Sequence, residues 1–424
     1  MPRCYAIDFG TSNSLLAAAD GDQVIPPISL DASASDPTVL KSVLYTPMQG
    51  QWYFGADAVN QYGINQAEGR LFRSLKKYLP EAGFSGTHVH SRYFNLPELI
   101  SVFLRELRER ANTFFNEDVT TVMLGRPAVF ASDGDKDQLA EKRLTTAANL
   151  AGFKEVYYCP EPVAAAYEFR HQLDRKRKVL IADFGGGTSD FTVLNMDREQ
   201  FSDNDILATH GIPIAGDRFD GVIMKHMIAP HFGSEVVYRM PMGSNDLQLP
   251  RQLINKMCSA ADISFLSRRD ILGLLKEAQQ WSITPVNAKL MDRLFVLIEE
   301  HLGYKLFRSI EQSKIELSKA ELAQFRFDHH EIVIEDELSA ANFRKFSATI
   351  VDEIIAALDE TLRRAGVKAS DIEIVCCTGG TASIPELRAE LEKRFGADAL
   401  RQHRHFHSVV GGLAERAVAL GVAG

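Results

Sequence analysis

Cysteine is scarce in this chain of 424 residues: there are five, an odd number, and no two form a CxxC pair. Neither a disulfide framework nor a cysteine zinc site is therefore expected. Long apolar runs are also missing. None approaches the roughly 18 residues of a membrane span, and Asp8 interrupts the N-terminal apolar stretch. We expect a cytoplasmic protein without membrane contact.

Basic tracts are missing as well. The chain has 47 Lys and Arg against 56 Asp and Glu, a net charge of −9, and no Lys/Arg-rich tract that would make a nucleic-acid footprint. Nucleic acid is therefore not an expected partner. Apolar residues make up 45% and charged residues 24%, as in folded globular proteins. At about 150 residues per domain, the length predicts two to three domains.

The apolar pattern of the first 177 residues predicts alternating strands and helices. Two apolar segments around Gly10 indicate a β-hairpin over Tyr5–Ala19, and a small inserted lobe with a strand at Ser42–Thr46 follows. Apolar spacing of i, i+3, i+4 predicts a helix at Leu96–Phe115. The next expected elements are a strand at Val119–Leu124, a helix at Asp137–Ala151, a strand at Val156–Cys159 and a helix at Pro162–His171. This order indicates an α/β sheet with crossovers.

After the charged segment Arg175–Lys178 the pattern starts again. Strands expected at Val179–Asp183 and Asp190–Asn195 flank a glycine cluster, as the first hairpin flanks Gly10. This weak self-similarity indicates two related lobes with a cleft between them.

The remaining chain is predicted to be mainly helical. Met224–Val333 is expected to be mostly helix, with longer helices around Ile271–Trp281 and Leu290–His301. Further expected elements are a helix at Ala340–Ala365, a strand at Ile372–Cys377, and helices at Pro385–Phe395 and Val409–Leu420.

Three glycine turns each follow an apolar strand. They are Asp8-Phe-Gly-Thr-Ser12, Asp183-Phe-Gly-Gly-Gly-Thr-Ser-Asp190 and Thr378-Gly-Gly-Thr381. Exposed amides in such turns can hold phosphates, and each turn adds a hydroxyl donor. One turn alone is more typical of an ordinary tight hairpin. Three together indicate a phosphate site.

Acidic residues end the strands before the first two turns. Asp8 and Asp183 could hold a hydrated Mg²⁺ beside phosphates through its waters, or simply bond to turn amides. The sequence has no GxxxxGK[ST] motif, and no GxGxxG opens a helix after the first strand. A P-loop and a Rossmann site are therefore disfavoured.

These motifs, with Glu161-Pro-Val-Ala-Ala-Ala166 and Thr378-Gly-Gly-Thr-Ala-Ser-Ile-Pro385, occur in the order found in the actin-like ATPase superfamily. The chain resembles its DnaK-type heat-shock chaperone family over nearly its whole length. Gly125-Arg126-Pro127 and the position of the last residue make it most similar to the truncated YegD-type members. The resemblance implies a two-lobed α/β fold of ribonuclease H-like duplicated domains, with a central nucleotide cleft and inserted outer subdomains.

The resemblance assigns the phosphate and catalytic roles residue by residue. Lys76 would reach the γ-phosphate, although Lys77 beside it is an alternative, and Glu161 would lie near the attacking water. Asp8 and Asp183 would orient Mg²⁺ waters, and Pro127 would couple nucleotide state to lobe movement. Thr188 and Asp190 are candidate contacts for K⁺. The phosphate-binding positions would be Gly10, Thr11, Ser12, Asn13, Gly185, Gly186, Gly187 and Thr188.

The adenosine contacts implied by the resemblance lie later in the chain. They are Gly216, Asp217, Glu311, Lys314, Ser318, Gly379, Gly380, Thr381 and Ser383. The family's two adenine-stacking arginines fall at Ile315 and Ser383, and its late aspartate falls near Phe406. An arginine stack can contribute about 1 kcal/mol, so weaker ATP binding or looser base selectivity is expected.

The resemblance also implies the domain boundaries. The first lobe would be 1–177, with an inserted subdomain at about 23–94 and a returning C-terminal helix at 402–424. The second would be 178–401, with an enlarged outer subdomain at about 214–346. The chain ends without the linker and peptide-binding domain of the full chaperones, so peptide clamping of its own is not expected.

The function predicted from this resemblance is binding of Mg-ATP and slow hydrolysis to ADP and phosphate. The protein would be a chaperone-related switch, read by an unidentified protein such as a co-chaperone or exchange factor. The open alternatives are a small-molecule kinase or phosphatase of the same superfamily, a non-hydrolysing nucleotide sensor, and an actin-like polymer.

Overall fold

The computed structural model describes two compact units. Unit 1 comprises Met1–Ala215 and Glu353–Gly424, and unit 2 comprises Gly216–Asp352. The predicted lobe boundary at 177/178 falls inside unit 1 and stays a prediction. The described residues are 3–48, 50–65, 68–131, 133–198, 203–330, 332–402 and 407–423. Phe406 lies outside them, as do residues 403–405 of the returning segment predicted at 402–424.

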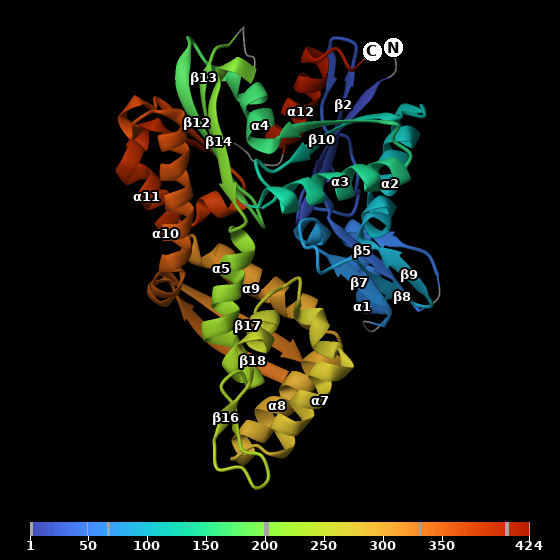
Figure 1. Cartoon of the computed structure of the whole chain (residues 1–424), viewed down its shortest axis with the longest axis vertical. Helices are drawn as coiled ribbons and strands as arrows, with labels where there is room; N and C mark the ends of the chain where they lie inside the picture. Colours follow the sequence, from blue (N-terminus) through green and yellow to red (C-terminus); the bar gives the residue numbers. More distant parts are fainter. Residues whose placement is uncertain are drawn as a thin grey trace. The chain divides into compact units, whose positions relative to one another are not determined.

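The first sheet of unit 1 has the strand order β11-β10-β1-β2-β3, with β4 also pairing with β2 (Figure 1). β1 pairs antiparallel with β2 and parallel with β10. Most residues of β1 and β2 are buried, because helices cover the sheet, and this explains their continuous apolar sequence. The strands are β1 (Cys4–Phe9), β2 (Asn13–Asp20), β3 (Gln23–Ile25), β4 (Leu40–Lys41), β10 (Thr121–Arg126) and β11 (Glu155–Pro160).

The second sheet repeats this topology in the order β14-β13-β12-β19-β20. β12 pairs antiparallel with β13 and parallel with β19. Phe9 pairs with Ser14 at the first turn and Phe184 pairs with Ser189 at the second, so the two hairpins share one register. The strands are β12 (Arg177–Phe184), β13 (Ser189–Met196), β14 (Ile206–Ile212), β19 (Ile374–Thr378) and β20 (Leu400–Gln402).

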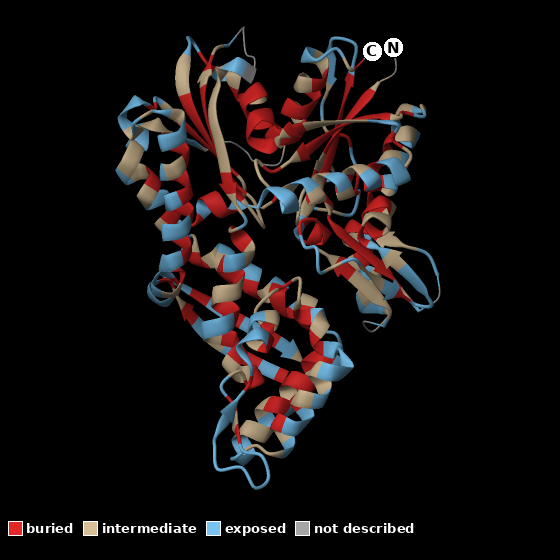
Figure 2. Ribbon diagram, in the orientation of Figure 1, coloured by how far each residue is buried: buried red, intermediate tan, exposed pale blue. Residues whose placement is uncertain are grey.

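Helices α4 (Glu161–Phe169) and α12 (His407–Ala419) pack together between the two sheets (Figure 1). Their residues share one apolar cluster with side chains from both sheets, and α4 is buried along almost its whole length (Figure 2). The helices touch through small residues: a Cβ at Gly412 would lie 1.7 Å from the Ala164 carbonyl oxygen. Glycine is therefore required at this crossing.

Helix α2 (Leu96–Phe115) covers the first sheet, where its Phe103 ring lies 5.7 Å from that of Phe9. Asn95 begins the helix through a reciprocal capping box with Glu98. Helix α3 (Gly134–Leu150) packs against α2. The predicted range of α2 is confirmed at both ends.

The segment between β3 and α2 forms a small mixed region. Its three-stranded sheet has the order β6-β5-β7, and β8 pairs with β9. A 3₁₀ helix, η1 (Leu75–Tyr78), carries the tandem lysines. The other elements are β5 (Val43–Thr46), β6 (Tyr53–Phe54), α1 (Gly55–Ile64), β7 (Arg70–Arg73), β8 (Gly86–Val89) and β9 (Arg92–Asn95).

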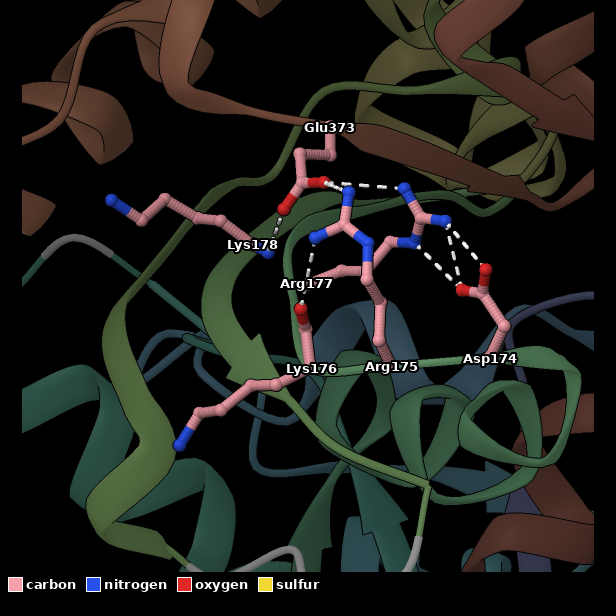
Figure 3. A network of polar contacts seen from close by, with 6 residues as sticks. All are labelled: Asp174, Arg175, Lys176, Arg177, Lys178 and Glu373. Carbon is pink, nitrogen blue, oxygen red and sulfur yellow. Dashed lines mark hydrogen bonds and ion pairs between the residues drawn. The ribbon is translucent and has the colours of Figure 1, made fainter.

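The charged segment Arg175–Lys178 at the start of β12 connects that strand to the beginning of β19 (Figure 3). Arg175 and Arg177 both donate to Glu373, at 2.6 and 3.2 Å, and Arg177 also donates to Asp174. The backbone amide of Lys178 donates to the Glu373 carboxylate, and the backbone amide of Glu373 donates to the Lys178 carbonyl. These contacts fix where the two strands begin.

Two further predicted helices lie in the last part of the chain. Helix α10 (Ala340–Ala365) crosses the boundary between the units, and α11 (Pro385–Phe395) begins after the third glycine turn. Both ranges are those predicted from the sequence.

Unit 2 is helical at first but contains a hairpin that the sequence prediction missed. β17 (Leu322–His329) pairs with β18 (Ile332–Ser339), so the expectation of helix up to Val333 is wrong there. Every second residue of β17 is buried, which is the strand period. The other elements are α5 (Gly216–Ile223), β15 (Val237–Tyr238), β16 (Leu247–Gln248), α6 (Arg251–Met257), α7 (Arg269–Gln280), α8 (Pro285–Glu299) and α9 (Gly303–Leu317). Among the described residues, no helix has the length and apolarity to cross a bilayer.

Candidate functional site

The first two glycine turns have the same backbone geometry. The Gly10 amide donates to the Asn13 carbonyl at 3.0 Å, and the Gly185 amide donates to the Thr188 carbonyl at 2.9 Å. A Cβ at Gly10 would lie 2.2 Å from the Asn13 oxygen, so no larger residue fits this turn. Both turns close the end of a buried hairpin.

The two turns lie next to each other in unit 1. A Cβ at Gly187 would lie 3.1 Å from Thr11 Oγ1, which places the first turn beside the second. The Ala128 amide, just after β10, donates to Asp190 Oδ1 at 2.7 Å and connects the first sheet to β13. A Cβ at Gly211 would meet the same oxygen at 2.3 Å. Asp190 is therefore held in a close-fitting, buried position.

The third turn lies against the second. Gly379 has φ +81°, and a Cβ there would lie 2.0 Å from the Phe184 carbonyl oxygen. Thr381 Oγ1 donates to the Gly185 carbonyl at 2.9 Å. Gly380 and Ser383, in the 3₁₀ helix Gly380–Ser383, are exposed.

The remaining positions of the loops are also placed. The Ser42 amide donates to the Ser12 carbonyl and its hydroxyl donates to the Gly10 carbonyl, at 2.9 and 2.8 Å. Ser12 itself is exposed, and Gly186 is half-buried between its glycine neighbours. Segments distant in sequence therefore support both turns.

Lys76 forms a buried ion pair with Glu161. Lys76 Nζ donates to Glu161 Oε1 at 2.5 Å, and both residues are less than 9% exposed. Lys77 is exposed, so the two adjacent lysines are distinguished by burial. Arg143 of α3 donates to the Tyr78 carbonyl at 3.1 Å and also to the carbonyls of Leu79 and Glu81, just after η1. The ammonium is thus placed from three elements.

Three further carboxyl groups interact with this pair: Asp8 is partly buried, and Asp183 and Asp190 are buried. Burial raises the pKa of Asp8 to about 8, with the negative charge of Glu161 adding to the effect. Burial likewise raises the pKa of Asp183 to about 6, although the Thr378 hydroxyl, which donates to Asp183 Oδ1 at 2.7 Å, opposes the shift. The pKa of Asp190 is also raised by burial and by Glu161, against a hydrogen bond from the Thr188 side chain.

The charge balance of this cluster favours a cation. Burial acts to lower the pKa of Lys76, but the negative charges of Glu161, Asp8 and Asp190 outweigh it and raise that pKa. One ammonium therefore faces four carboxyl groups. Within the described chain, these carboxyl groups do not place three oxygens within 4.8 Å of one another. That spacing suits Mg²⁺ held through its own waters better than direct chelation.

The predicted adenosine contacts fall in both units. In unit 2, Lys314 Nζ on α9 pairs with Asp220 Oδ1 of α5 at 2.8 Å and donates to the Gly216 carbonyl at 3.5 Å. Burial acts to lower the pKa of Lys314, yet Asp220, Glu311 and Asp217 raise it. Ser318 donates to the Ile315 carbonyl just after α9. Gly216, Asp217 and Glu311 thus surround the Lys314 ammonium.

Sequence reasoning missed two residues of these clusters. Thr378 stands in a motif already singled out, but its bond to Asp183 was not expected because 195 positions separate them. Asp220 stands one helical turn after Asp217. The i, i+3 spacing places Asp220 on the same face of α5 as Asp217, and this spacing is the sequence signal that could have predicted its place in the cluster.

Comparison with known proteins now identifies the chain. The family model described as "Hsp70 protein" matches residues 75–238 and 298–421. The chain belongs to the Hsp70 family. Its membership confirms the predicted DnaK-type resemblance and the actin-like ATPase fold. Residues 239–297, which carry α6, α7 and most of α8, lie outside the matched segments of this Hsp70-family chain.

Two curated relatives carry the name "Chaperone protein DnaK". They come from Halobacterium salinarum strains ATCC 29341 / DSM 671 / R1 and ATCC 700922 / JCM 11081 / NRC-1, and each is 24% identical to this chain over 404 residues. The alignment covers 93% of this chain and 52% of each relative. The Hsp70-family chain described here thus spans about half the length of the curated relatives it matches. Family membership supports a nucleotide-binding, chaperone-related protein.

Proposed function

We propose that this protein binds Mg-ATP and hydrolyses it slowly to ADP and phosphate. It acts in the cytoplasm as a chaperone-related conformational switch, and a protein partner such as a co-chaperone or exchange factor reads its nucleotide state. The Lys76–Glu161 ion pair, buried among Asp8, Asp183 and Asp190 beside the two glycine turns, carries the proposal. The five cysteines all lie among the described residues and form no disulfide there, which fits a reducing compartment.

Each group has a role that phosphoryl transfer requires. The Gly10 and Gly185 amides close the two turns, so the amides of Thr11, Ser12, Gly186 and Gly187 bind phosphate oxygens. Lys76 neutralises charge on the transferred group. Glu161 orients the attacking water. Asp8 and Asp183 hold the magnesium waters, and the bound metal supplies further charge neutralisation.

The cation and nucleoside contacts complete the proposal. Thr188 and Asp190 are the proposed contacts for K⁺, because burial raises the pKa of Asp190 and a neighbouring cation would favour its ionised form. The ribose and adenine contacts proposed in unit 2 are Gly216, Asp217, Glu311, Lys314 and Ser318, and those proposed in unit 1 are Gly379, Gly380, Thr381 and Ser383.

Single-turnover hydrolysis tests the proposal. Purified protein is mixed with a limiting amount of ATP in Mg²⁺ and K⁺, and bound nucleotide and released phosphate are followed together. We expect binding followed by slow conversion to ADP. Absence of ATP binding, or full retention of ATP over hours, would refute hydrolysis as the function.

A pair of lysine variants tests the site itself. Lys76→Ala should lower the single-turnover rate at least tenfold, because the ammonium that neutralises the transferred phosphoryl group is lost. Lys77→Ala is the matched control, one residue away and exposed, and should keep the wild-type rate. Thermal unfolding of each variant reports whether the fold survives. Equal rates in the two variants would show that Lys76 is not the catalytic lysine.

A further inference from the structure

Two consecutive histidines and a glutamate meet in unit 2. His329 is the last residue of β17, His330 follows it in the turn before β18, and Glu300 follows α8. One ligating atom from each side chain lies within 4.8 Å of the other two. His329 Nε2 is 2.5 Å from Glu300 Oε2. Of the residues that the structure describes, this is the one such group of three or more His, Cys, Asp or Glu side chains.

The backbone at His330 brings the two imidazoles together. Successive side chains of a strand normally point to opposite faces, so neighbouring histidines would be separated. His330 instead has φ +45°, in the left-handed region that residues other than glycine rarely adopt. The two rings consequently lie with centroids 4.4 Å apart at an interplanar angle of 69°.

Lys305 fixes the end of β17 against helix α9. Its Nζ donates to the Asp328 carbonyl at 2.7 Å and lies 5.6 Å from the centre of the Phe327 ring. The same ammonium is 3.5 Å from His329 Nδ1. The other ring nitrogen, Nε2, faces Glu300 and is therefore the atom available to an ion that the carboxylate also binds.

We propose that Glu300, His329 and His330 bind one divalent transition-metal ion of the zinc class. Imidazole nitrogens and a carboxylate oxygen are ordinary zinc ligands, and the nitrogen donors disfavour Mg²⁺ and Ca²⁺. Three protein ligands leave a position for water. The ion joins the end of α8 to the β17–β18 turn and so stabilises unit 2. This site requires no nucleotide, so its test does not depend on whether the protein is an ATPase.

Zinc binding by the full chain tests the site. The protein is stripped with a chelator, freed of nucleotide and titrated with ZnCl₂ against a chromophoric competitor. His330→Asn is the most informative variant, because asparagine tolerates a left-handed backbone while removing one imidazole. We expect His330→Asn and Glu300→Gln each to weaken zinc binding at least tenfold and to abolish the zinc-dependent rise in the unfolding temperature of the wild type.

His231→Ala is the matched control. His231 Nε2 lies 3.2 Å from Asp336 Oδ2, and among the described residues this histidine–carboxylate pair of the same unit belongs to no larger group of potential metal ligands. This variant should bind zinc as the wild type does. Unchanged zinc affinity in both His330→Asn and Glu300→Gln would overturn the proposal. So would an equal loss in His231→Ala, or equally tight binding of MgCl₂.

Discussion

Asp183→Asn is expected to raise the stability of the nucleotide-free protein while it removes nucleotide-dependent function. The substitution keeps the size of the side chain and the oxygen that accepts the Thr378 hydroxyl at 2.7 Å. It removes a negative charge that lies in a buried cluster near Glu161. The same charge is the one proposed to hold magnesium waters.

The size of the effect follows from the pKa of Asp183. Burial raises this pKa from 3.8 to about 6, so the folded state holds the proton more tightly than the unfolded state. The group's contribution to stability is therefore complete below about pH 4 and is lost as the pH rises through about 6. At about 1.4 kcal/mol per pKa unit, ionisation costs about 3 kcal/mol at pH 8. Asp183→Asn avoids this cost.

Urea unfolding of nucleotide-free protein in a chelator measures the prediction. At about pH 8, Asp183→Asn should exceed the wild type by up to ~3 kcal/mol in unfolding free energy, and at about pH 4 the two should nearly coincide. Adding Mg-ATP at about pH 8 should raise the unfolding midpoint of the wild type but not that of the variant.

Asp174→Asn provides a control with the opposite sign. Asp174 is exposed, and its hydrogen bond with Arg177 lowers its pKa. Neutralising it should slightly decrease stability above that pKa. An Asp183→Asn variant that is no more stable than the wild type at about pH 8, or that gains the same stability at both pH values, would show that ionisation of Asp183 does not destabilise the folded state.

Two further predictions concern the water-orienting group and the helix layer. Glu161→Gln should lower the rate of single-turnover hydrolysis at least tenfold while ATP still binds, because the carboxylate that orients the attacking water is lost. Filter binding measures ATP binding, and phosphate release measures hydrolysis. An unchanged rate would exclude Glu161 as the group that orients water. Gly412→Ala should destabilise the protein by about 1–3 kcal/mol or more in urea unfolding, because the new methyl group would lie 1.7 Å from the Ala164 oxygen. Gly273 is an exposed position of α7, and a Cβ there would have nothing within 4 Å, so Gly273→Ala should instead stabilise the protein by about 0.5–1 kcal/mol. A loss of stability in Gly273→Ala as large as that in Gly412→Ala would show that close packing is not the cause at Gly412.

The helices of unit 1 were largely predictable from local pattern. Leu96–Phe115 has its apolar residues on one face and a capping box at Asn95, so local sequence and tertiary packing favour the same ends. The β17–β18 hairpin was missed although Ala323, Phe325 and Phe327 alternate with polar residues. The period of the apolar residues changes from 3.6 to 2 at this hairpin, so the helical pattern of the preceding residues does not continue into it.

The site was predictable in its motifs but not in its pairings. Glycine turns after apolar strands are visible in the sequence, because they follow from local backbone requirements. Lys76 and Lys77 cannot be distinguished by residue type, since only the fold brings one of them to Glu161, 85 positions away. Asp190 occupies the position of Leu15 in the repeated register, and only its amide partner at Ala128 shows why a carboxylate is tolerated there.

The helix layer and the site connect the two sheets of unit 1 in mechanically different ways. At the layer, Gly412 against Ala164 and the shared apolar cluster leave no room for one helix to slide over the other. At the site, the sheets meet through replaceable contacts, such as the Ala128–Asp190 hydrogen bond and Thr11 beside Gly187. Any opening of the site would therefore be a rotation with its axis near α4 and α12. The turns lie far from this axis, so a small rotation would displace them more than residues near the helices. A molecule bound between the turns would therefore contact the residues that move most.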